Sequence, residues 1–334
     1  MITFGVALVL LFAIALLYFK IANKYNIVDK PNQRSSHTKV TIRGGGVIFP
    51  LAFIAGTLLF QPQNGYLALA VLAISSISFI DDVLTLSNKI RISVHTLAVG
   101  LAVYQCVNNQ PYLQDFIGNS SIIFLVGCAV VTFVLFIGII NACNFMDGIN
   151  GISVLYFTVV LGSVCFVQSK LGVFLFTNGV WQIFFASLVV FGFFNVRTKA
   201  KTFAGDVGSI ALALILCFLV LSLMVNTQQI KWILLLSIYG LDTICTILCR
   251  LCRGENIFEA HRSHFYQYLA NKRKIGHITI SVAYALLQLL VNYFLLYNTS
   301  GLYAFIIFAL IVVAYCCLRL YFEGKNALFN RYPY

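Results

Sequence analysis

Apolar runs long enough to cross a membrane recur from one end of this 334-residue chain to the other. A helix needs about 20 mostly apolar residues to span a bilayer core, and backbone in lipid must satisfy its hydrogen bonds internally. The pattern predicts an all-α polytopic membrane helical bundle, with residues 1–334 forming one integral domain of about eleven spans. We place the spans at 3–19, 47–60, 66–80, 90–107, 121–140, 152–168, 180–195, 207–225, 232–250, 277–297 and 302–320.

Composition supports this class. The chain is 60% hydrophobic and 10% charged, which is more apolar surface than a soluble core of this length could bury. The first run lacks the basic segment and cleavage site of a signal peptide, so we expect it to remain as an anchor. The ten cysteines lie mostly inside the runs and predict no disulfide framework.

Basic residues are distributed unequally between the connections. Twenty of the 22 Lys and Arg residues fall in alternate connections, and only Lys170 and Lys231 fall in the others. The positive-inside rule then predicts an N-terminus outside and a C-terminus in the cytoplasm. The net charge of +12 is therefore explained by loop asymmetry, and no motif indicates nucleic acid as a partner.

A polar stretch at 141–151 separates two of the runs. It contains Asn141, Asn144, Asp147 and Asn150 together with two glycines. Residues three apart share a helix face, so these side chains can converge on one ligand. A simple turn would need only the glycines.

Acidic residues mark the cytoplasmic ends of two further runs. Asp81 and Asp82 end the third run, and adjacent carboxylates repel by about 1 kcal/mol in water at 4 Å unless a cation lies beside them. Asp206 opens the eighth run, where it could cap a helix or hold a metal ion. Three acidic clusters at cytoplasmic helix ends favour shared Mg²⁺ chemistry with phosphates.

The first cytoplasmic loop is basic. Arg34, His37 and Arg43 can bind an anion, and three glycines after Arg43 allow close backbone approach to a ligand. An ordinary positive-inside loop is the alternative interpretation.

The loop after the ninth run contains His261, Arg262 and His264, which we expect to donate to phosphate or sugar hydroxyls. Cys249 and Cys252 precede them and imitate a zinc site. Two residues between the histidines is shorter than the usual spacing, so zinc is the weaker interpretation.

Asp242 lies about two turns inside the ninth run. An acid at mid-membrane costs about 2.5–3.5 kcal/mol on insertion scales, so it normally lines a cavity or pairs with a cation. A structural partnership and a role in the site both remain open. His95 and His277 are expected to be packing or interfacial residues.

Together these motifs resemble the polyprenyl-phosphate N-acetylhexosamine-1-phosphate transferases, glycosyltransferase family 4, which includes the phospho-N-acetylmuramoyl-pentapeptide translocase. The resemblance extends through nearly every cytoplasmic loop. It is carried by Asp29-x-Pro-Asn-x-Arg-Ser-Ser-His with Arg43-Gly-Gly-Gly, Asp81-Asp82, Asn141-x-x-Asn-Phe-x-Asp-Gly-x-x-Gly, Gly205-Asp-x-Gly-Ser and His261-Arg-x-His.

The resemblance implies transfer of a sugar 1-phosphate from a UDP-N-acetylhexosamine to polyprenyl (undecaprenyl) phosphate, with release of UMP. Mg²⁺, or Mn²⁺ in its place, would be the cofactor. The enzyme would lie in the bilayer of a bacterial inner membrane with its active site facing the cytoplasm, and a homodimer is compatible with this setting. It would initiate a lipid-linked surface glycan such as O-antigen, capsule or cell wall.

The resemblance also implies roles. Asp81, Asp82, Asp147 and His261 would be catalytic, and Asp206 with Asp82 would bind the metal. The substrates would contact Arg34, His37, Arg43, Asn144, Asn150, Arg262 and His264.

One departure matters: many relatives carry an acid where Asn150 stands, which removes a carboxylate from the expected uracil contact. A membrane transporter or lipid flippase that uses Asp242 as its coupling acid is the competing function. A membrane phosphatase is a third.

Overall fold

The computed structural model describes residues 2–29, 40–84, 86–257, 259, 261–297 and 301–330. Ten of the helices in these segments are long and apolar enough to cross a membrane, and a shorter apolar helix spans Gly45–Phe60. Each of the eleven predicted spans corresponds to one of these helices, so the all-α fold is confirmed. The orientation across the membrane stays a prediction.

The long helices are α1 (Ile2–Lys24), α3 (Gly65–Leu84), α4 (Asn88–Asn108), α6 (Ile122–Met146), α7 (Ile152–Leu171), α8 (Asn178–Asn195), α9 (Gly205–Thr227), α12 (His277–Tyr297) and α13 (Leu302–Glu323). The tenth span joins the 3₁₀ helix η3 (Ile230–Leu236) to α10 (Ser237–Cys252). Shorter elements are β1 (Val28–Asp29), β2 (Thr41–Ile42), η1 (Gly45–Val47), α2 (Ile48–Phe60), η2 (Pro62–Asn64), α5 (Pro111–Asn119), α11 (Phe265–Asn271) and α14 (Lys325–Phe329).

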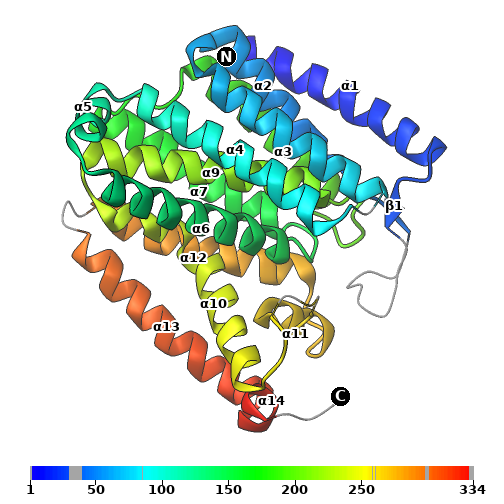
Figure 1. Ribbon diagram of the computed structural model, residues 1–334. Coiled ribbons are helices and arrows are strands. Elements are labelled where there is room, and N and C mark those ends of the chain that lie inside the picture. Colours follow the sequence, from blue (N-terminus) through cyan, green and yellow to red (C-terminus); the bar gives the residue numbers. More distant parts are fainter. Residues whose placement is uncertain are drawn as a thin grey trace.

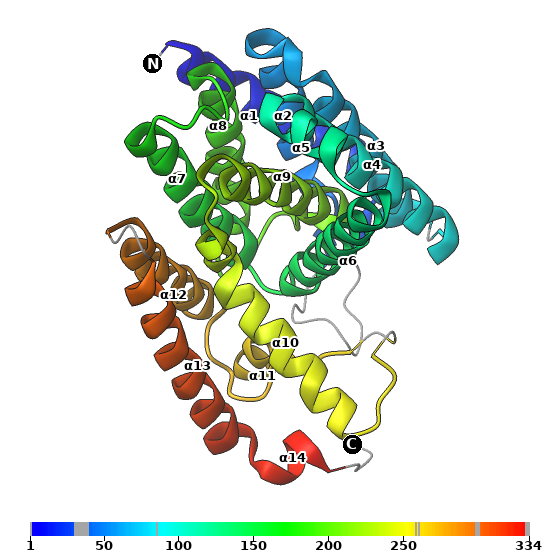
Figure 2. The same ribbon diagram turned by 60° about the vertical axis from the view of Figure 1, so that its left-hand side comes forward.

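Helix α9 forms the centre of the bundle, with α3, α6 and α2 packed on it (Figures 1 and 2). Every residue at 207–220 is buried, and the sequence there is apolar on all sides. A helix that is hydrophobic all round belongs inside a bundle. Its first turn, which carries Asp206, is therefore held by a rigid element.

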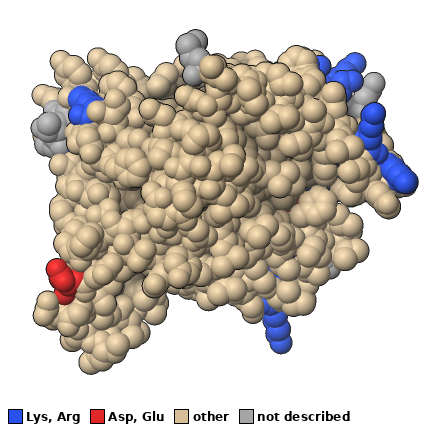
Figure 3. All heavy atoms as spheres, turned by 90° about the horizontal axis from the view of Figure 1, so that it is seen from above, with Lys and Arg blue, Asp and Glu red and all other residues tan. Residues whose placement is uncertain are grey.

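The outer surface is apolar. Figure 3 shows a face on which charged side chains are confined to the margins and the broad middle carries none. Helices α6 and α13 leave most of their apolar residues exposed. An exposed apolar surface of this extent is suited to contact with lipid.

Helix α10 leaves the bundle and runs between α12 and α14 (Figures 1 and 2). Polar groups at its junction with η3 are hydrogen-bonded to the side chain of Gln288 from α12. Gln288 accepts from the Ile238 N–H and the Ser237 hydroxyl, both at 3.1 Å, and donates to the Leu234 carbonyl at 2.9 Å. Backbone groups freed at such a break need side-chain partners when they are buried. The side chain of Gln288 thus stabilises the junction from which α10 departs.

The glycine segment after Arg43 packs against the start of α9. The Gly46 N–H donates to the Ala204 carbonyl at 3.1 Å, and a Cβ atom at Gly46 would lie 2.6 Å from the Gly208 Cα atom. The sequence predicted close approach of this backbone to a ligand. In the structure the small residues instead permit close contact between two backbone segments, which places Arg43 beside the first turn of α9.

Candidate active site

The carboxylate of Asp82, at the end of α3, caps the N-terminus of α9. It accepts hydrogen bonds from the N–H groups of Asp206 and Val207, both at 3.2 Å, and pairs with Arg43 Nε at 2.8 Å. The unpaired N–H groups at a helix N-terminus favour a negative group of this kind. Sequence analysis considered Asp206 as the cap, but a neighbour in space takes that role.

The adjacent carboxylate turns to different partners. Asp81 accepts from the Leu86 N–H at 2.6 Å and pairs with Arg91 Nη1 at 2.9 Å. Successive side chains on a helix diverge, so the two acids reach separate cations. In the structure two arginines lie beside the pair, and the expected divalent metal stays a prediction.

Asp206 lies between the same two arginines. Arg43 Nη2 is 3.7 Å and Arg91 Nη2 is 3.8 Å from its carboxylate oxygens, which is longer than a hydrogen bond. The Asn144 amide lies next to this carboxylate and accepts from the Ser209 hydroxyl at 2.7 Å. We call Asp81, Asp82, Asp206, Arg43 and Arg91 the carboxylate–arginine cluster.

The cluster offers donor atoms suited to a hard divalent cation. Among the described residues no group of three or more His, Cys, Asp or Glu side chains is arranged to hold a metal. Mg²⁺ typically takes only one or two protein carboxylates and completes its shell with phosphate and water oxygens. Asp206 has the least committed carboxylate, with Asp82 and Asp147 nearby, so the residues present fit Mg²⁺ held jointly with a phosphate substrate.

Asp147 lies just beyond α6. That helix continues through Met146, so Asn141 and Asn144 are helical and only 147–151 forms the connection to α7. Burial, together with the negative charges of Asp206 and Asp82, raises the pKa of the Asp147 carboxyl to about 7. A carboxyl that titrates near neutrality suits proton transfer or metal binding.

Asn150 points away from Asp147 and the carboxylate–arginine cluster. It is 4% exposed, and its amide donates to the Arg197 carbonyl at 2.8 Å while its backbone N–H donates to His277 Nδ1 at 3.4 Å. Asn144 and Asn150 therefore do not share one ligand as the helical spacing suggested. Helix α6 ends at Met146, and the turn at Gly151 (φ 86°) leads into α7, so the helical spacing does not extend to Asn150.

Asn150 lines a cavity of about 660 Å³ beside the cluster. Three lysines give it a positive lining, and Phe203 offers an aromatic face three residues before Asp206. We call it the lysine cavity; its lining comprises Val40, Thr41, Asn150, Thr198, Lys199, Ala200, Lys201, Phe203, Ala270, Lys274, Ile275, Gly276, His277, Ile278 and Thr279. The cavity has the charge and size to hold a phosphorylated small molecule.

The loop at 261–267 is fastened to the bundle by Asp242, which is fully buried in α10. His264 Nδ1 lies 3.0 Å from Asp242 Oδ1, and the Tyr284 hydroxyl donates to Oδ2 at 2.5 Å. Three further donors complete its shell: the N–H groups of Phe265 (3.1 Å) and Tyr266 (3.3 Å) and the Thr246 hydroxyl (3.2 Å).

The same loop packs against the end of α6. The Tyr266 hydroxyl donates to the Phe145 carbonyl at 2.7 Å, and the rings of His261 and His264 stack with centroids 5.0 Å apart beside Phe145. Gly148 meets the same tyrosine so closely that a Cβ atom there would lie 2.2 Å from its hydroxyl. The loop therefore lies next to Asp147.

His261 is neutral near pH 7. Burial, together with the neighbouring His264 and Arg250, lowers the pKa of its imidazole to about 4. Its Nδ1 lies 3.5 Å from the Ser263 N–H and 3.0 Å from the Ser263 hydroxyl. Because the N–H can only donate, we assign the proton to Nε2. Arg262 lies half-buried between the two histidines in the same loop.

Two predicted substrate contacts, Arg34 and His37, lie outside the described residues. The zinc alternative gains no support, because Asp242 takes His264 Nδ1, Cys252 is exposed, and the described residues form no metal-binding group. Sequence analysis missed Arg91, which it counted only as a loop charge. As the nearest arginine after Asp81 and Asp82, it could have been proposed as their counter-ion.

Comparison with known proteins agrees with this arrangement. The family model for glycosyl transferase family 4 matches residues 65–224. A probable undecaprenyl-phosphate N-acetylglucosaminyl 1-phosphate transferase of Bacillus subtilis is 24% identical over 282 residues, covering 80% of this chain and 76% of the relative. An undecaprenyl-phosphate alpha-N-acetylglucosaminyl 1-phosphate transferase of Yersinia pestis is 26% identical over 312 residues, covering 84% and 81%.

A phospho-N-acetylmuramoyl-pentapeptide-transferase of Streptococcus thermophilus is 28% identical over 229 residues, covering 61% of this chain and 64% of the relative. Members of the matched family are sugar-1-phosphate transferases and are generally metal-dependent. With its membrane helices and its clustered carboxylates, this chain is similar to glycosyl transferase family 4 over residues 65–224, and it is a distant homologue of the undecaprenyl-phosphate N-acetylglucosamine-1-phosphate transferases.

Proposed function

We propose that the protein transfers an N-acetylhexosamine 1-phosphate from a UDP-sugar to undecaprenyl phosphate at the cytoplasmic face of a bacterial inner membrane, releasing UMP. The names of the relatives from Bacillus subtilis and Yersinia pestis suggest the acceptor and the class of sugar. The product would be the first lipid-linked intermediate of a surface glycan.

One observation carries the proposal. Acids from α3, α9 and the α6–α7 connection gather with Arg43 and Arg91, and Phe203 of the lysine cavity lies three residues before Asp206. Both substrates carry phosphates, and their transfer needs cations that offset negative charge and groups that position the reacting atoms. A site at helix ends also lets a lipid phosphate reach the cluster while its chain stays in the bilayer.

The donor would lie with its nucleotide in the lysine cavity and its diphosphate toward the arginines. An oxygen of the lipid phosphate attacks the phosphorus that carries the sugar, the bond between the two donor phosphates breaks, and UMP leaves with the bridging oxygen. The Nη2 groups of Arg43 and Arg91 can turn from Asp206 to phosphate oxygens, since those contacts are long, while the short pairs with Asp82 and Asp81 are kept.

Mg²⁺, when bound, would supply charge neutralisation for the diphosphate and the departing UMP. Asp206 would hold it, with Asp82 and Asp147 beside it. Asp147, with its pKa near 7, would exchange protons with the phosphate groups, and His261 would donate its Nε2–H to the sugar.

The transporter alternative depends on Asp242 binding or releasing a proton or ion. In the structure this carboxylate accepts five hydrogen bonds from three helices and a loop. That arrangement favours a fixed structural charge over a coupling acid, since a coupling acid must exchange partners during transport.

A donor panel tests the proposal. Purified protein in nanodiscs is supplied with undecaprenyl phosphate, Mg²⁺ and one of several UDP-N-acetylhexosamines, and UMP and the lipid product are measured by mass spectrometry. We expect UMP only when lipid phosphate and Mg²⁺ are both present. Asp115→Asn, an exposed acid on α5, serves as the matched control and should retain activity.

Release of inorganic phosphate would instead indicate a phosphatase. Solute or lipid flux across sealed vesicles without UMP would indicate a transporter. Absence of UMP with every UDP-sugar would contradict the proposal.

A further inference from the structure

We propose that Asp242 is a positioning residue which fixes His264 in the tautomer that presents a bare Nε2 atom to the donor sugar. The inference rests on the proposed function and names a role for an acid that lies outside the carboxylate–arginine cluster. The ligand group that Nε2 would take is a hydrogen-bond donor, such as a sugar hydroxyl or acetamido N–H.

The tautomer follows from the hydrogen bonds. An ionised carboxylate only accepts, so the 3.0 Å contact with Asp242 Oδ1 places the proton on His264 Nδ1. Nε2 then carries a lone pair. The His264 side chain is 2% exposed, and Nε2 has no hydrogen-bond partner among the described residues. A buried polar atom without a partner requires an explanation, and a substrate group provides one.

The ring cannot easily turn. Its Asp242 partner is itself held by the Tyr284 hydroxyl from α12, and the backbone on both sides of the loop is anchored. Arg319 of α13 donates to the Ser263 carbonyl at 2.8 Å and to the Thr246 hydroxyl at 3.1 Å. Carboxylate–histidine pairs of this kind set tautomer and ring direction in many active sites.

Two substitutions of His264 separate the roles of its nitrogens. A Gln amide places a polar group near the position of Nε2, whereas an Asn amide places one near Nδ1. If Nε2 serves the substrate, His264→Gln should retain at least about tenfold more kcat than His264→Asn. If the ring serves only to bind Asp242, the ranking should reverse, and the inference is then overturned.

Asp242→Asn tests the partner. It preserves shape but removes the charge, and we expect kcat to fall about 10- to 100-fold with KM nearly unchanged, as for other residues that orient a catalytic ligand. Asp115→Asn is the control. Adding His264→Gln to Asp242→Asn should cost little more than either change alone, whereas independent, multiplied losses would contradict positioning.

Each variant is also assayed by thermal denaturation, so that loss of fold is not mistaken for loss of positioning. Isotope-labelled histidine NMR of the wild-type protein should show the Nδ1–H tautomer at one buried histidine in the absence of substrate, and its absence would refute the proposal. That signal does not depend on the identity of the reaction. Failure of the wild-type protein to release UMP would instead count against the proposed function.

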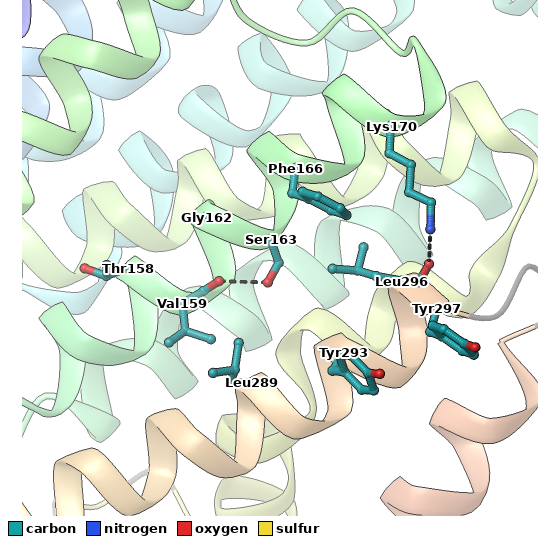
Figure 4. Close-up of a pocket in the computed structure, with 10 residues that line it drawn as sticks. All are labelled: Thr158, Val159, Gly162, Ser163, Phe166, Lys170, Leu289, Tyr293, Leu296 and Tyr297. Carbon is teal, nitrogen blue, oxygen red and sulfur yellow. Dashed lines mark hydrogen bonds between the residues drawn. The ribbon is translucent and has the colours of Figure 1, made fainter. Parts of the chain in front are cut away.

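A different observation carries a second inference. A groove of about 560 Å³ lies between α7 and α12. Figure 4 shows the apolar side chains of Phe166, Leu289 and Leu296 that line it. Lys170 stands at one end, where its Nζ donates to the Leu296 carbonyl at 2.8 Å. Tyr293 and Tyr297 line the same end, with ring centroids 5.9 Å apart.

The groove runs along the halves of α7 and α12 that lie farther from the active site. Its lining begins at Thr158 and Leu289 and continues to the C-terminal ends of the two helices, whereas the N-terminal ends carry Gly151 and His277 beside the lysine cavity. At 1.5 Å per residue, Lys170 at the far end of the groove lies roughly 27 Å along α7 from its first residue. Predicted topology places the groove in the outer leaflet.

We infer that this groove binds an anionic phospholipid, with one acyl chain against α7 and α12 and the headgroup phosphate at Lys170. An apolar channel that opens into a bilayer is filled by a chain, and tyrosines and lysine at its mouth match the headgroup level. Lys231 lies close enough for its charge to repel that of Lys170. An anionic headgroup would reduce this repulsion by its net negative charge. A zwitterionic headgroup has no net charge and would reduce the repulsion less.

Native mass spectrometry with phosphatidylglycerol and phosphatidylcholine tests the assignment. We expect wild-type protein to retain phosphatidylglycerol at about tenfold lower lipid concentration. Gly162→Leu should abolish this preference, because a Cβ atom there meets nothing within 4 Å and the larger side chain would fill the groove. Lys170→Gln should abolish it as well.

Gly138→Leu on α6 is the matched control, since its added side chain also meets open space but lies away from the groove. Equal binding of both lipids, an unchanged preference in Gly162→Leu, displacement of the phospholipid by polyprenyl phosphate, or appearance of a dimer in its place would overturn the inference.

Discussion

Two groups of buried acidic side chains in this protein differ in how completely their negative charge is compensated by hydrogen bonds and cations. Asp242 is a single carboxylate that receives five hydrogen bonds, whereas Asp81, Asp82 and Asp206 share two arginines. The first group is saturated, and the second has negative charge left over. A saturated charge organises structure, while an excess of one sign in a confined site requires a further cation or substrate.

The difference teaches how to separate acids that maintain the fold from acids that serve the reaction. Both kinds stand at helix ends or within spans, so position alone does not distinguish them. Their hydrogen-bond partners do. Substitutions on the two sides should therefore produce opposite combinations of activity and stability.

The largest effect is expected for Asp206→Asn. The variant loses the carboxylate with the longest arginine contacts, and we expect UMP release to fall by at least about 100-fold, as for other metal or acid–base positions. Thermal stability in EDTA should stay the same or rise, because repulsion with Asp82 is reduced. A loss of less than tenfold, or a large loss of stability, would remove the distinction between the two groups.

Asp242→Ala should behave in the reverse way. Removing the acceptor takes away the partner of His264 Nδ1, the Tyr284 hydroxyl and the N–H groups of Phe265 and Tyr266, and breaking a buried charge network costs about 3–5 kcal/mol. We expect a strong fall in the denaturation temperature measured in detergent. Tyr284→Phe, which removes one donor and leaves the charge, should cost much less, and equal effects of the two changes would contradict the network.

Gly46→Ala should give an intermediate effect. Its Cβ atom would lie 2.6 Å from the Gly208 Cα atom, so the two backbones would have to separate and Arg43 would move with them. Overpacking of this kind costs about 1–3 kcal/mol, and transferase activity should fall together with stability. Gly138→Ala, in open space on α6, is the control and should change neither quantity.

The sequence was sufficient for the spans because hydropathy and length are local properties. It also proposed Asp82 and Asp206 as site residues, because the Asp81–Asp82 pair at a helix C-terminus opposes the helix dipole and an acid at a helix start can hold a metal ion. It could not assign partners. Whether Arg43 or a metal ion faces Asp82 depends on how α3 and α9 meet, which no local pattern encodes.

The polar stretch at 141–151 shows why side-chain partners could not be predicted from sequence spacing. Spacing of three residues suggested one face, but the turn at Gly151 and the end of α6 direct Asn144 and Asn150 to different places. Asp242 was left undecided for a similar reason. Its five donors come from residues up to 42 positions away in sequence, and only the folded arrangement brings them together.

The smallest expected effect concerns pH and Asp147. Because its pKa is raised from 3.8 to about 7, the neutral form favours the folded state. This contribution is present below about pH 4 and is lost as pH rises through 7. In EDTA, the wild-type denaturation temperature should therefore fall between pH 5 and 8 by about 2–4 °C more than that of Asp147→Asn.

Activity should respond in the opposite direction, since an ionised Asp147 is needed to accept a proton or bind a cation. We expect kcat/KM to rise with pH through a limb near 7 at low Mg²⁺. The limb should move to lower pH as Mg²⁺ increases, because a nearby cation favours the carboxylate. If the pH at which kcat/KM rises does not change with Mg²⁺ concentration, Asp147 does not bind the cation. It would then be an acid that stabilises the fold, as Asp242 is.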